Sequence, residues 1–445
     1  MTRLAQRNLP AADVLIRGAH LYDPVEGVDR TADLLVRSGR IVQIGEGLDA
    51  PPDVRVVSGA HRTVLPGLVD PHVHLRVPGQ EHKEDCASGS AAAAAGGYTT
   101  ILSMPNTDPV IDSGTTLEAA LERAAEGAVI PVGFLAAISV GRAGESLTEM
   151  RDLAARGAAG FTDDGSPVES PRLLRRALQY VRPLGLPLAL HEEEPSLTRG
   201  GHMHEGAVSA TLGLGAWPSI AETLMVARDI RLAELEDARI HLQHLSSRGS
   251  VEEVARGRER GVRVSSEASP HHLTLTDAAV RSLDGNVKMN PPLGSEDDRQ
   301  ALIEGLRSGV IDCIATDHAP HALHEKEVPF EAAAFGVTGL ETALPILLEE
   351  LVEPGLVPLA TILRAMTEGP CSAFDLERPA LRVGAAANLA LWDLAAPWTV
   401  GDAPFKSRSA NSCFLGRRVR GRCLLTIAAG RIAHDETDRK AVSAV

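Results

Sequence analysis

Between residues 64 and about 320 the chain repeats one unit eight times: a short apolar run, polar residues at its end, and then a helix-type or alanine-rich stretch. Strands that alternate with helical stretches are typical of parallel βαβ units. The runs cover residues 64–69, 98–104, 129–137, 158–161, 186–190, 239–242, 262–266 and 311–316. Eight runs predict an α/β fold closed into a (β/α)8 barrel of the TIM type.

The stretches between the runs contain helix boundaries. Residues 84–95 predict a helix that stops at Gly96-Gly97, and a second helix is expected over 219–235 with Pro218 as its first helical residue. An open doubly wound sheet is the alternative, but the G-x-G-x-x-G turn of a dinucleotide fold does not follow the early runs. Polar residues of metal-binding type recur after several runs, which favours the barrel.

Both ends of the chain differ from the middle. Short alternating segments at 12–22, 33–44, 388–392 and 422–432 predict β-hairpins. One signature occurs twice, a Leu-Leu pair followed by Gly39-Arg40-Ile41 and again by Gly430-Arg431-Ile432. We expect one small β-sandwich-like domain from residues 1–64 and 379–445 beside a barrel domain of residues 65–378, with two separate caps as the alternative.

Composition narrows the function classes. The chain has 445 residues, 44% of them hydrophobic, and a net charge of -15 without long acidic runs, which is typical of a globular protein and argues against a nucleic-acid partner. It has no signal-peptide pattern, and no uncharged apolar stretch approaches the ~20 residues of a spanning helix, so no membrane partner is expected. Five scattered cysteines suit a reducing compartment, and we expect a cytoplasmic protein.

Metal-type side chains stand at the ends of five runs. Two histidines spaced i, i+2, His72 and His74, close the first run and leave the same strand face. Each such residue alone has an ordinary structural explanation, such as a buried histidine bonded to the backbone. In a parallel barrel, however, all strand carboxyl ends share one rim. Four histidines and two aspartates on that rim match the ligand set of a catalytic zinc or manganese site.

The ordered motifs resemble those of one family. They are Asp70-Pro71-His72-Val73-His74-Leu75-Arg76, Met104-Pro105-Asn106-Thr107, Phe161-Thr162-Asp163-Asp164-Gly165, Lys288-Met289-Asn290-Pro291-Pro292 and Thr316-Asp317-His318-Ala319-Pro320-His321. Together they resemble the dihydroorotases, in the bacterial subgroup of the cyclic amidohydrolases. The resemblance spans nearly the whole chain and implies a (β/α)8 barrel beside a β domain made from both termini.

The resemblance also implies a metal site. By it, the first metal is bound by His72, His74 and Asp317, the second by His191 and His244, and Asp164 bridges the two. Many relatives use a carboxylated lysine as the bridge, but residues 158–165 contain no lysine. One or two zinc ions are expected.

The implied substrate pair is carbamoyl aspartate and its cyclic form, dihydroorotate. The planar fork of Arg76 suits the substrate carboxylate, and a surface salt bridge is its structural alternative. By resemblance, Asn106 and His321 share that carboxylate, while Asn290 and the backbone around Phe335 and Gly336 bind the ring amides.

A metal in such a site acidifies water and polarises the ring carbonyl. Asp317 is then expected to be catalytic, since it would take a proton from the attacking hydroxide and deliver it to the departing amide nitrogen. In the biosynthetic direction it would deprotonate the ureido nitrogen. A structural Asp317 that caps its loop is the alternative.

Some positions depart from the family pattern. Val77 stands where relatives often carry glutamate, and Glu192-Glu193-Glu194 follows the histidine at 191 in place of a small residue, Glu and Asp. His271-His272 could support the metal ligands or cap a helix.

Two other functions fit a chain of this kind. A hydantoinase, dihydropyrimidinase or allantoinase-like enzyme would share barrel and metals but gives no reason for Arg76 and Asn106 together. A non-catalytic scaffold that partners aspartate transcarbamoylase typically loses metal histidines, which are all present here. A homodimer and an association with aspartate transcarbamoylase are further expectations.

Overall fold

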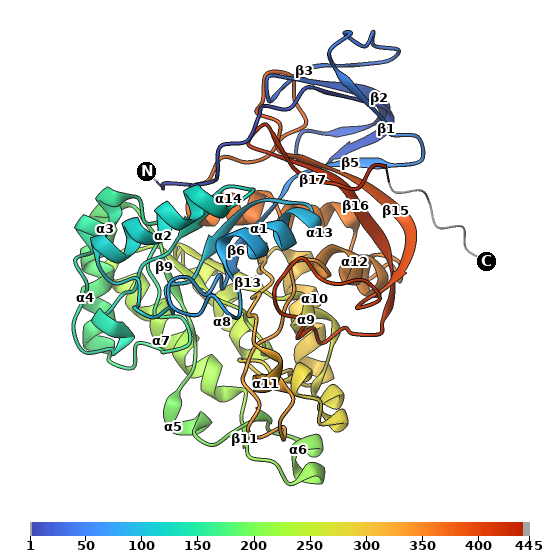
Figure 1. Ribbon diagram of the computed structural model, residues 1–445. Helices are drawn as coiled ribbons and strands as arrows, with labels where there is room; N and C mark the ends of the chain where they lie inside the picture. The colour runs from blue at the N-terminus through green and yellow to red at the C-terminus, as the bar shows by residue number, and fades with distance from the viewer. Residues whose placement is uncertain (1, 439–445) are drawn as a thin grey trace.

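The computed structural model describes residues 2–438 and shows a barrel with a β-sheet at one end (Figure 1). The barrel occupies the middle of the chain, and the sheet takes strands from both ends of it. Short helices project from the barrel at the end opposite the sheet (Figure 1). The expected α/β fold, a (β/α)8 barrel with a β domain from both termini, is confirmed.

Seven parallel strands and one bridging residue form the barrel. The strands are β6 (Leu68–Val73), β7 (Tyr98–Ser103), β8 (Val132–Phe134), β9 (Leu188–Leu190), β12 (Ile240–Leu242), β13 (Val264–Ala268) and β14 (Cys313–Ile314). They pair in the orders β6-β7-β8 and β14-β13-β12-β9. Phe161 joins the two groups through parallel bridges to Ala136 and Leu188, and a bridge from Val73 to His318 closes the ring.

Two predicted runs differ from the structure. Residues 158–161 form no strand beyond the bridges of Phe161, because the chain turns away after this single residue. The predicted run 64–69 is two strands, β5 (Thr63–Pro66) in the terminal sheet and β6 in the barrel. The chain changes partner at Gly67, whose N–H donates to the carbonyl of Asn388, while the next N–H donates to Gly97. Only glycine fits there, since an added Cβ would lie 2.2 Å from Thr99.

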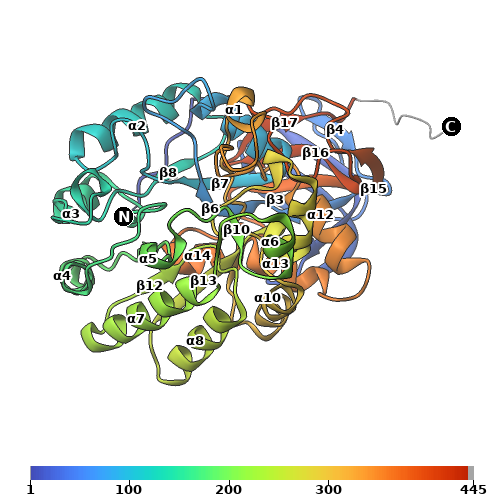
Figure 2. The ribbon, with the colours of Figure 1, turned by 90° about the horizontal axis from the view of Figure 1, so that it is seen from below.

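Helices surround the barrel strands (Figure 2). They are α1 (Cys86–Ala95), α2 (Gly114–Gly127), α3 (Met150–Arg156), α4 (Pro171–Val181), α5 (Pro195–Thr198), α6 (Ala207–Leu212), α7 (Ile220–Glu236), α8 (Arg248–Glu259), α9 (Pro270–Thr274), α10 (Glu296–Ser308), α11 (Leu323–Lys326), α12 (Ala343–Leu347), α13 (Leu359–Ala365) and α14 (Glu368–Phe374). Shorter 3₁₀ or π turns cover Val140–Arg142, Arg182–Leu184, Asp277–Ser282, Gly285–Val287 and Leu348–Val352.

The helix boundaries follow local chemistry. Helix α1 ends at Gly96 as predicted and is capped by Asp85, whose side chain accepts from the N–H of Ser88. The prediction of Pro218 as the first helical residue was wrong, because α7 begins at Ile220. Residue 217 still pairs in β11 (Ala216–Trp217) with β10 (Met203–His204), so Pro218 lies in the turn between strand and helix.

Within residues 2–438, the terminal sheet has eight strands. They are β1 (Val14–Asp23), β2 (Val28–Arg37), β3 (Arg40–Gly45), β4 (Arg55–Ser58), β5, β15 (Leu389–Thr399), β16 (Arg418–Ala428) and β17 (Arg431–Asp435). Their order is β17-β16-β15-β5-β1-β2-β3, with β4 paired to β1. The predicted domain boundaries, 64/65 and 378/379, stay a prediction.

The twice-repeated glycine signature marks two hairpin turns that touch. Gly39 turns β2 into β3 and Gly430 turns β16 into β17, each with φ of 75°. A Cβ added to Gly430 would lie 2.5 Å from the carbonyl oxygen of Gly39. Glycine is required at both positions for the backbone conformation and for this contact.

The sheet packs on the barrel through β15 and β16. Trp392 of β15 lies against Gly97 at the end of α1, and the hydroxyl of Thr426 donates to the carbonyl of Ala94 at 2.7 Å. The loop between the two strands, residues 400–417, runs from the sheet along the barrel (Figure 1). We call it the β15–β16 loop.

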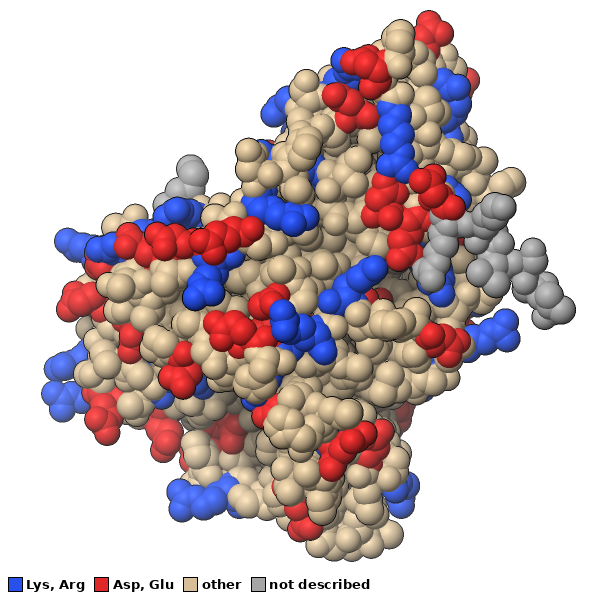
Figure 3. Space-filling model, viewed as in Figure 1, with Lys and Arg blue, Asp and Glu red and all other residues tan. Residues whose placement is uncertain are grey.

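Two further observations concern the charge of the surface and the presence of membrane-spanning helices. Positive and negative side chains are interspersed on the face shown in Figure 3. Within residues 2–438, no helix is both long enough and apolar enough to cross a membrane.

Candidate metal centre

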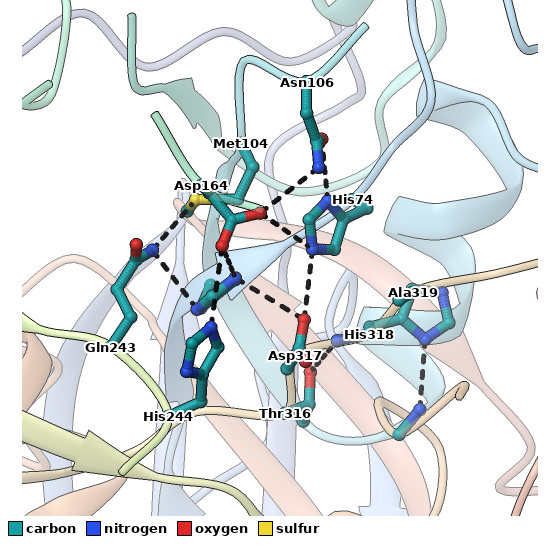
Figure 4. Close-up of polar contacts among 12 residues, drawn as sticks. His74, Met104, Asn106, Asp164, Gln243, His244, Thr316, Asp317, His318 and Ala319 are labelled. Atoms are coloured by element: carbon teal, nitrogen blue, oxygen red, sulfur yellow. Dashed lines mark hydrogen bonds and ion pairs between the residues drawn. The ribbon is translucent and has the colours of Figure 1, made fainter. Parts of the chain in front are cut away.

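Asp164 lies where the carboxyl ends of the barrel strands converge (Figure 4). Its side chain is surrounded by the imidazoles of His72, His74, His191 and His244 at nitrogen to oxygen distances of 3.5, 3.6, 3.8 and 3.6 Å. These residues come from four segments of the chain, so only the closed barrel brings them together.

We define the first cluster as His72, His74 and Asp164. One nitrogen or oxygen atom from each lies within 4.8 Å of the others. Asp317 stands beside it, with its Oδ1 3.1 Å from His74 Nε2 and 3.5 Å from His72 Nε2. The structure therefore gathers all the residues predicted for the first metal.

We define the second cluster as Asp164, His191 and His244. Its three candidate ligand atoms also lie within 4.8 Å of one another. The ring of His191 presents Nδ1 to Asp164, because its Nε2 is 3.0 Å from Glu193. Oδ1 of Asp164 faces both clusters, which is the position that a bridging ligand needs.

The donor atoms fit a metal ion. His72 Nε2 is fully buried and has no hydrogen-bond partner within the described part of the chain, although it points at two carboxylates. The other nitrogen of the ring, Nδ1, lies 2.6 Å from Glu267. A hydrogen on Nδ1 donated to Glu267 leaves the Nε2 lone pair free, as a metal ligand requires. Imidazole nitrogens and carboxylate oxygens are the ligands of catalytic zinc and of related divalent metals.

Charge within the centre keeps its carboxylates ionised. Burial raises the pKa of Asp164, but His72 and His244 outweigh burial and hold that pKa well below its usual value. The pKa of Asp317 is lowered in the same way, by His72 and His74 against burial. Ionised carboxylates are the form that binds metal and that accepts a proton.

Three residues of the centre have an unusual backbone. Arg76, His244 and Asp317 have φ values of 59°, 31° and 46°, in the left-handed region that few residues other than glycine adopt. Such conformations cost on the order of 1 kcal/mol each and cluster at functional sites. Here they turn the chain sharply at three strand ends, and all three side chains line one cavity.

That cavity has a volume of about 230 Å³. Its walls are His74, Arg76, Asn106, Asp164, Gly165, His191, His244, Asn290, Asp317, Ala319, His321, Phe335 and Gly336. Every residue predicted for the metal or the substrate lines it except His72, which lies buried beside His74. A volume of this size suits a small ring compound.

Arg76 is the cation of this cavity. It is 8% exposed, and its guanidinium bonds the carbonyl of Pro320 and lies 3.3 Å from His321 Nε2. Among residues 2–438, no carboxylate lies within ion-pair distance of it. Burial lowers the pKa of Arg76. A buried guanidinium without a carboxylate partner is typical of an anion-binding site rather than a surface salt bridge.

The two predicted asparagines already have protein partners. Asn106 contacts two residues of the first cluster, with Oδ1 2.9 Å from His74 Nδ1 and Nδ2 3.2 Å from Asp164. Asn290 donates to Glu193 at 3.0 Å. Both side chains therefore orient residues of the centre as well as lining the cavity.

His321, Phe335 and Gly336 form another part of the cavity wall. His321 Nε2 donates to the carbonyl of Phe335 at 2.8 Å. Burial and the charge of Arg76 lower the pKa of His321 to about 3, so the ring is neutral. The N–H of Gly336 donates to Lys288 and its carbonyl accepts from Lys326, so a substrate bound to that backbone would have to displace these partners.

Two carboxylates near the centre escaped prediction. Glu267 of β13 accepts from His72 and lies 2.9 Å from His241 Nε2. Glu193 contacts His191 and Asn290. Burial raises the pKa of both glutamates, but the facing histidines outweigh it and lower each pKa to about 2. The only local signal for them was a charged residue at the end of an apolar run.

The pair His271-His272 is buried in α9. His272 Nδ1 is 2.7 Å from Ser269 Oγ, and its Nε2 is 2.9 Å from the carbonyl of Pro291, so this ring ties the helix start to the segment after Asn290. His271 Nε2 has no partner among the described residues.

Comparisons with known proteins show which family the chain resembles. A family model described as dihydro-orotase-like matches residues 61–250. A dihydroorotase of Anaeromyxobacter dehalogenans is 46% identical over 96% of this chain and 99% of its own length. A dihydroorotase of Geobacter is 43% identical over 95% of this chain and 99% of its own length.

Solved structures share the fold. An L-hydantoinase from Arthrobacter aurescens has a TM-score of 0.85 and 25% identity, covering 96% of both chains. A dihydropyrimidinase from Brevibacillus agri has a TM-score of 0.83 and 23% identity over 96% of this chain and 95% of its own. With the full-length relatives above, these likenesses show that the chain belongs to the dihydroorotase family of cyclic amide hydrolases.

Proposed function

We propose that the protein interconverts N-carbamoyl-L-aspartate and L-dihydroorotate, a step of pyrimidine biosynthesis, with a metal bound between the two clusters. The observation that carries this proposal is the position of Arg76. Its buried guanidinium, which lacks a carboxylate partner within residues 2–438, lines the same cavity as both clusters. Both substrates carry an α-carboxylate that takes no part in the opening or closing of the ring.

The metal would be held by His72, His74, His191, His244, Asp164 and Asp317. Zinc is the ion proposed, one or two per chain, because imidazole and carboxylate donors in a centre with room for water are typical of catalytic zinc. Asp164 is the proposed bridge, since its Oδ1 faces both clusters. When bound, the metal would supply an acidified water and polarise the ring carbonyl.

Asp317 is the proposed catalytic residue. Its carboxylate lines the cavity and is ionised, because His72 and His74 lower its pKa. In hydrolysis it would accept the proton of the attacking hydroxyl as the new C–O bond forms, and donate that proton to the ring nitrogen as the C–N bond breaks. In cyclisation it would take a proton from the ureido nitrogen as the C–N bond forms and donate that proton to the departing carboxyl oxygen as the C–O bond breaks, and with a second proton from solvent this oxygen leaves as water.

Arg76 is proposed to bind the substrate carboxylate. Its planar fork can form two parallel bonds to a carboxylate. His321 lies next to it at 3.3 Å, and Asn106 lines the same cavity. Asn290, Phe335 and Gly336 are the proposed contacts of the ring.

A hydantoinase-like activity on neutral rings is the second candidate, since hydantoinases share the fold. A neutral ring offers no anion to Arg76, however, and would leave a buried charge without a partner. A non-catalytic scaffold is less well supported, because all six predicted metal residues converge.

The test is an assay of the purified protein with carbamoyl aspartate, dihydroorotate, hydantoin, dihydrouracil and allantoin, with and without a chelator. We expect dihydroorotate turnover that is lost on chelation and restored by zinc. Turnover of neutral rings alone would support the second candidate, and no turnover in zinc-loaded protein would support the scaffold.

Three further proposals, on the compartment and the assembly of the protein, follow from the resemblance to dihydroorotases. We propose that the protein is cytoplasmic. We also propose that it forms a homodimer and that this homodimer associates with aspartate transcarbamoylase. Five free cysteines, four of them buried, are consistent with a reducing compartment. Light scattering of the purified protein, alone and mixed with that enzyme, tests both assembly states.

A further inference from the structure

The β15–β16 loop brings a part of the terminal segment to the cavity wall. Residues 400–417 leave the sheet and dock on the barrel, where the N–H groups of Lys406 and Ser407 donate to Glu341. Ser407 Oγ also donates to Glu84 at 2.5 Å, and Ser409 Oγ donates to the carbonyl of Lys83 at 2.8 Å. The loop is therefore fixed to the barrel at several points on the way to Asn411.

Asn411 uses its whole side-chain amide to join two barrel segments. Its Oδ1 accepts from the N–H of His321 at 3.1 Å. Its Nδ2 donates to the carbonyls of Ala319 and Gly336, each at 3.1 Å. The residue is 5% exposed, and its own carbonyl accepts from the N–H of Thr338 at 3.0 Å.

The backbone atoms that Asn411 binds belong to residues that line the cavity. Ala319, His321 and Gly336 all contribute to its wall, and Asn411 lies behind that wall, where it lines a neighbouring cavity together with His321. The two segments touch directly, because a Cβ added to Gly336 would lie 2.7 Å from Ala319 Cβ. Asn411 thus bonds both partners of a tight contact.

We propose that Asn411 is a positioning residue for substrate binding: its amide locks the His321 segment to the Gly336 segment and so sets the wall that faces Arg76. This inference rests on the proposed function. It assigns a role in the cavity to a residue outside the predicted barrel boundaries 65–378.

The consequence of losing the amide follows from its partners. Without it, the His321 N–H and the Ala319 carbonyl lose their contact, while the Gly336 carbonyl keeps Lys326 at 2.8 Å. Buried backbone groups left without partners favour a shift of the segment that restores hydrogen bonding. A shift would move His321 relative to Arg76 but would leave Asp317 and the metal residues in place. Substrate binding should therefore suffer more than the chemical step.

The experiment compares zinc-loaded wild type with Asn411→Ala, Asn411→Asp and the control Asn388→Ala. Asn388 also accepts a backbone N–H, from Ala429, but in the terminal sheet at the other end of the barrel. We expect Asn411→Ala to raise the KM for dihydroorotate about tenfold, with kcat changed less than about threefold and metal content unchanged. Asn411→Asp keeps the acceptor but loses both donors, so its KM should also rise.

Asn388→Ala should leave KM unchanged even if it lowers the melting temperature. Equal KM values for wild type and Asn411→Ala would overturn the inference. The same conclusion would follow if Asn388→Ala showed the same fall in kcat and rise in KM as Asn411→Ala. If the wild type does not turn over dihydroorotate, the proposed function fails instead. Turnover of dihydroorotate by the wild type, with the same KM in Asn411→Ala, overturns the inference alone, so the two failures remain distinguishable.

Discussion

The rim of the barrel and the terminal sheet are built in opposite ways. The barrel strands are short, and their ends carry buried charged side chains that converge on Asp164. The terminal sheet has strands of up to 11 residues, such as β15 and β16, and a buried core that is apolar. Both candidate metal clusters found among residues 2–438 lie on the barrel rim. The difference supports our proposal that the rim carries the chemistry while the sheet contributes stability.

Left-handed backbone conformations occur in both regions. At the rim, left-handed conformations occur at Arg76, His244 and Asp317. Glycine would suit the backbone at these positions, but each position requires the side chain that it carries. In the sheet, each hairpin turn pairs a glycine, for which the conformation costs little, with one left-handed residue before it: Ser38 before Gly39 and Ala429 before Gly430. Strain at functional positions must be supported by the surrounding fold.

The largest effect is expected for Asp317→Asn. The variant cannot accept the proton, so turnover should fall about a thousandfold or more while metal content largely remains. Steady-state kinetics and elemental analysis measure this. Asp312→Asn is the control, because Asp312 lies just before β14 and pairs with Arg258 away from the cavity. A variant that keeps more than a tenth of the wild-type rate would remove Asp317 from the mechanism.

Arg76→Met should reduce kcat/KM for dihydroorotate about a hundredfold, mainly through KM, because the carboxylate loses its two charged bonds. The control Arg239→Met breaks an exposed pair with Asp375 and should have no such effect. If the KM for dihydroorotate is unchanged, Arg76 does not bind the substrate carboxylate. The rim would then resemble that of a hydantoinase, which acts on neutral rings.

Gly430→Ala tests the other side of the comparison. The added Cβ would meet the backbone of Gly39, and we expect a loss of about 2 to 4 kcal/mol in the free energy of unfolding, with KM unchanged. Gly27→Ala is the matched control, since Gly27 has φ of 69° but open space around it, and should cost about 1 kcal/mol. Altered KM in folded Gly430→Ala protein would show that the sheet and the cavity are coupled at this turn.

The smallest effect, a change in the pH dependence of the melting temperature, is expected where the β15–β16 loop docks on the barrel. Burial raises the pKa of Glu341, which accepts N–H groups of the β15–β16 loop, to about 7. The folded state then binds a proton that the unfolded state releases, so the contribution of Glu341 is full below about pH 4.5 and is lost as the pH rises through 7. Glu341→Gln should therefore show a smaller fall in melting temperature between pH 5 and pH 8 than the wild type. The surface variant Glu349→Gln should keep the wild-type slope, and equal slopes for all three proteins would contradict the prediction.

Local patterns were enough for much of the fold. Apolar runs of strand length predicted the barrel segments, and the paired glycine signature predicted both hairpins that contain Gly39 and Gly430. The predictions failed where a contact from far along the chain decides the structure. Gly67 ends one strand because Asn388 pairs with it from a distant segment, and Phe161 alone replaces the fourth strand.

The candidate centre shows the same division. The histidines and aspartates that line the cavity could be found from their places after apolar runs. Glu193, Glu267 and Asn411 could not, because each is defined by partners from distant segments. The orientation of Asn106 toward His74 and Asp164 was also invisible before the barrel closed.

What the sequence by itself determined is the set of chemical groups and the period of their spacing, since hydrophobic alternation and residue type are local properties. Which ring nitrogen faces the centre, which carboxylate orients it and which loop walls the cavity were decided only by the tertiary structure. These choices depend on hydrogen bonds and close contacts between segments up to hundreds of residues apart, which form only when the barrel closes and the β15–β16 loop docks on it.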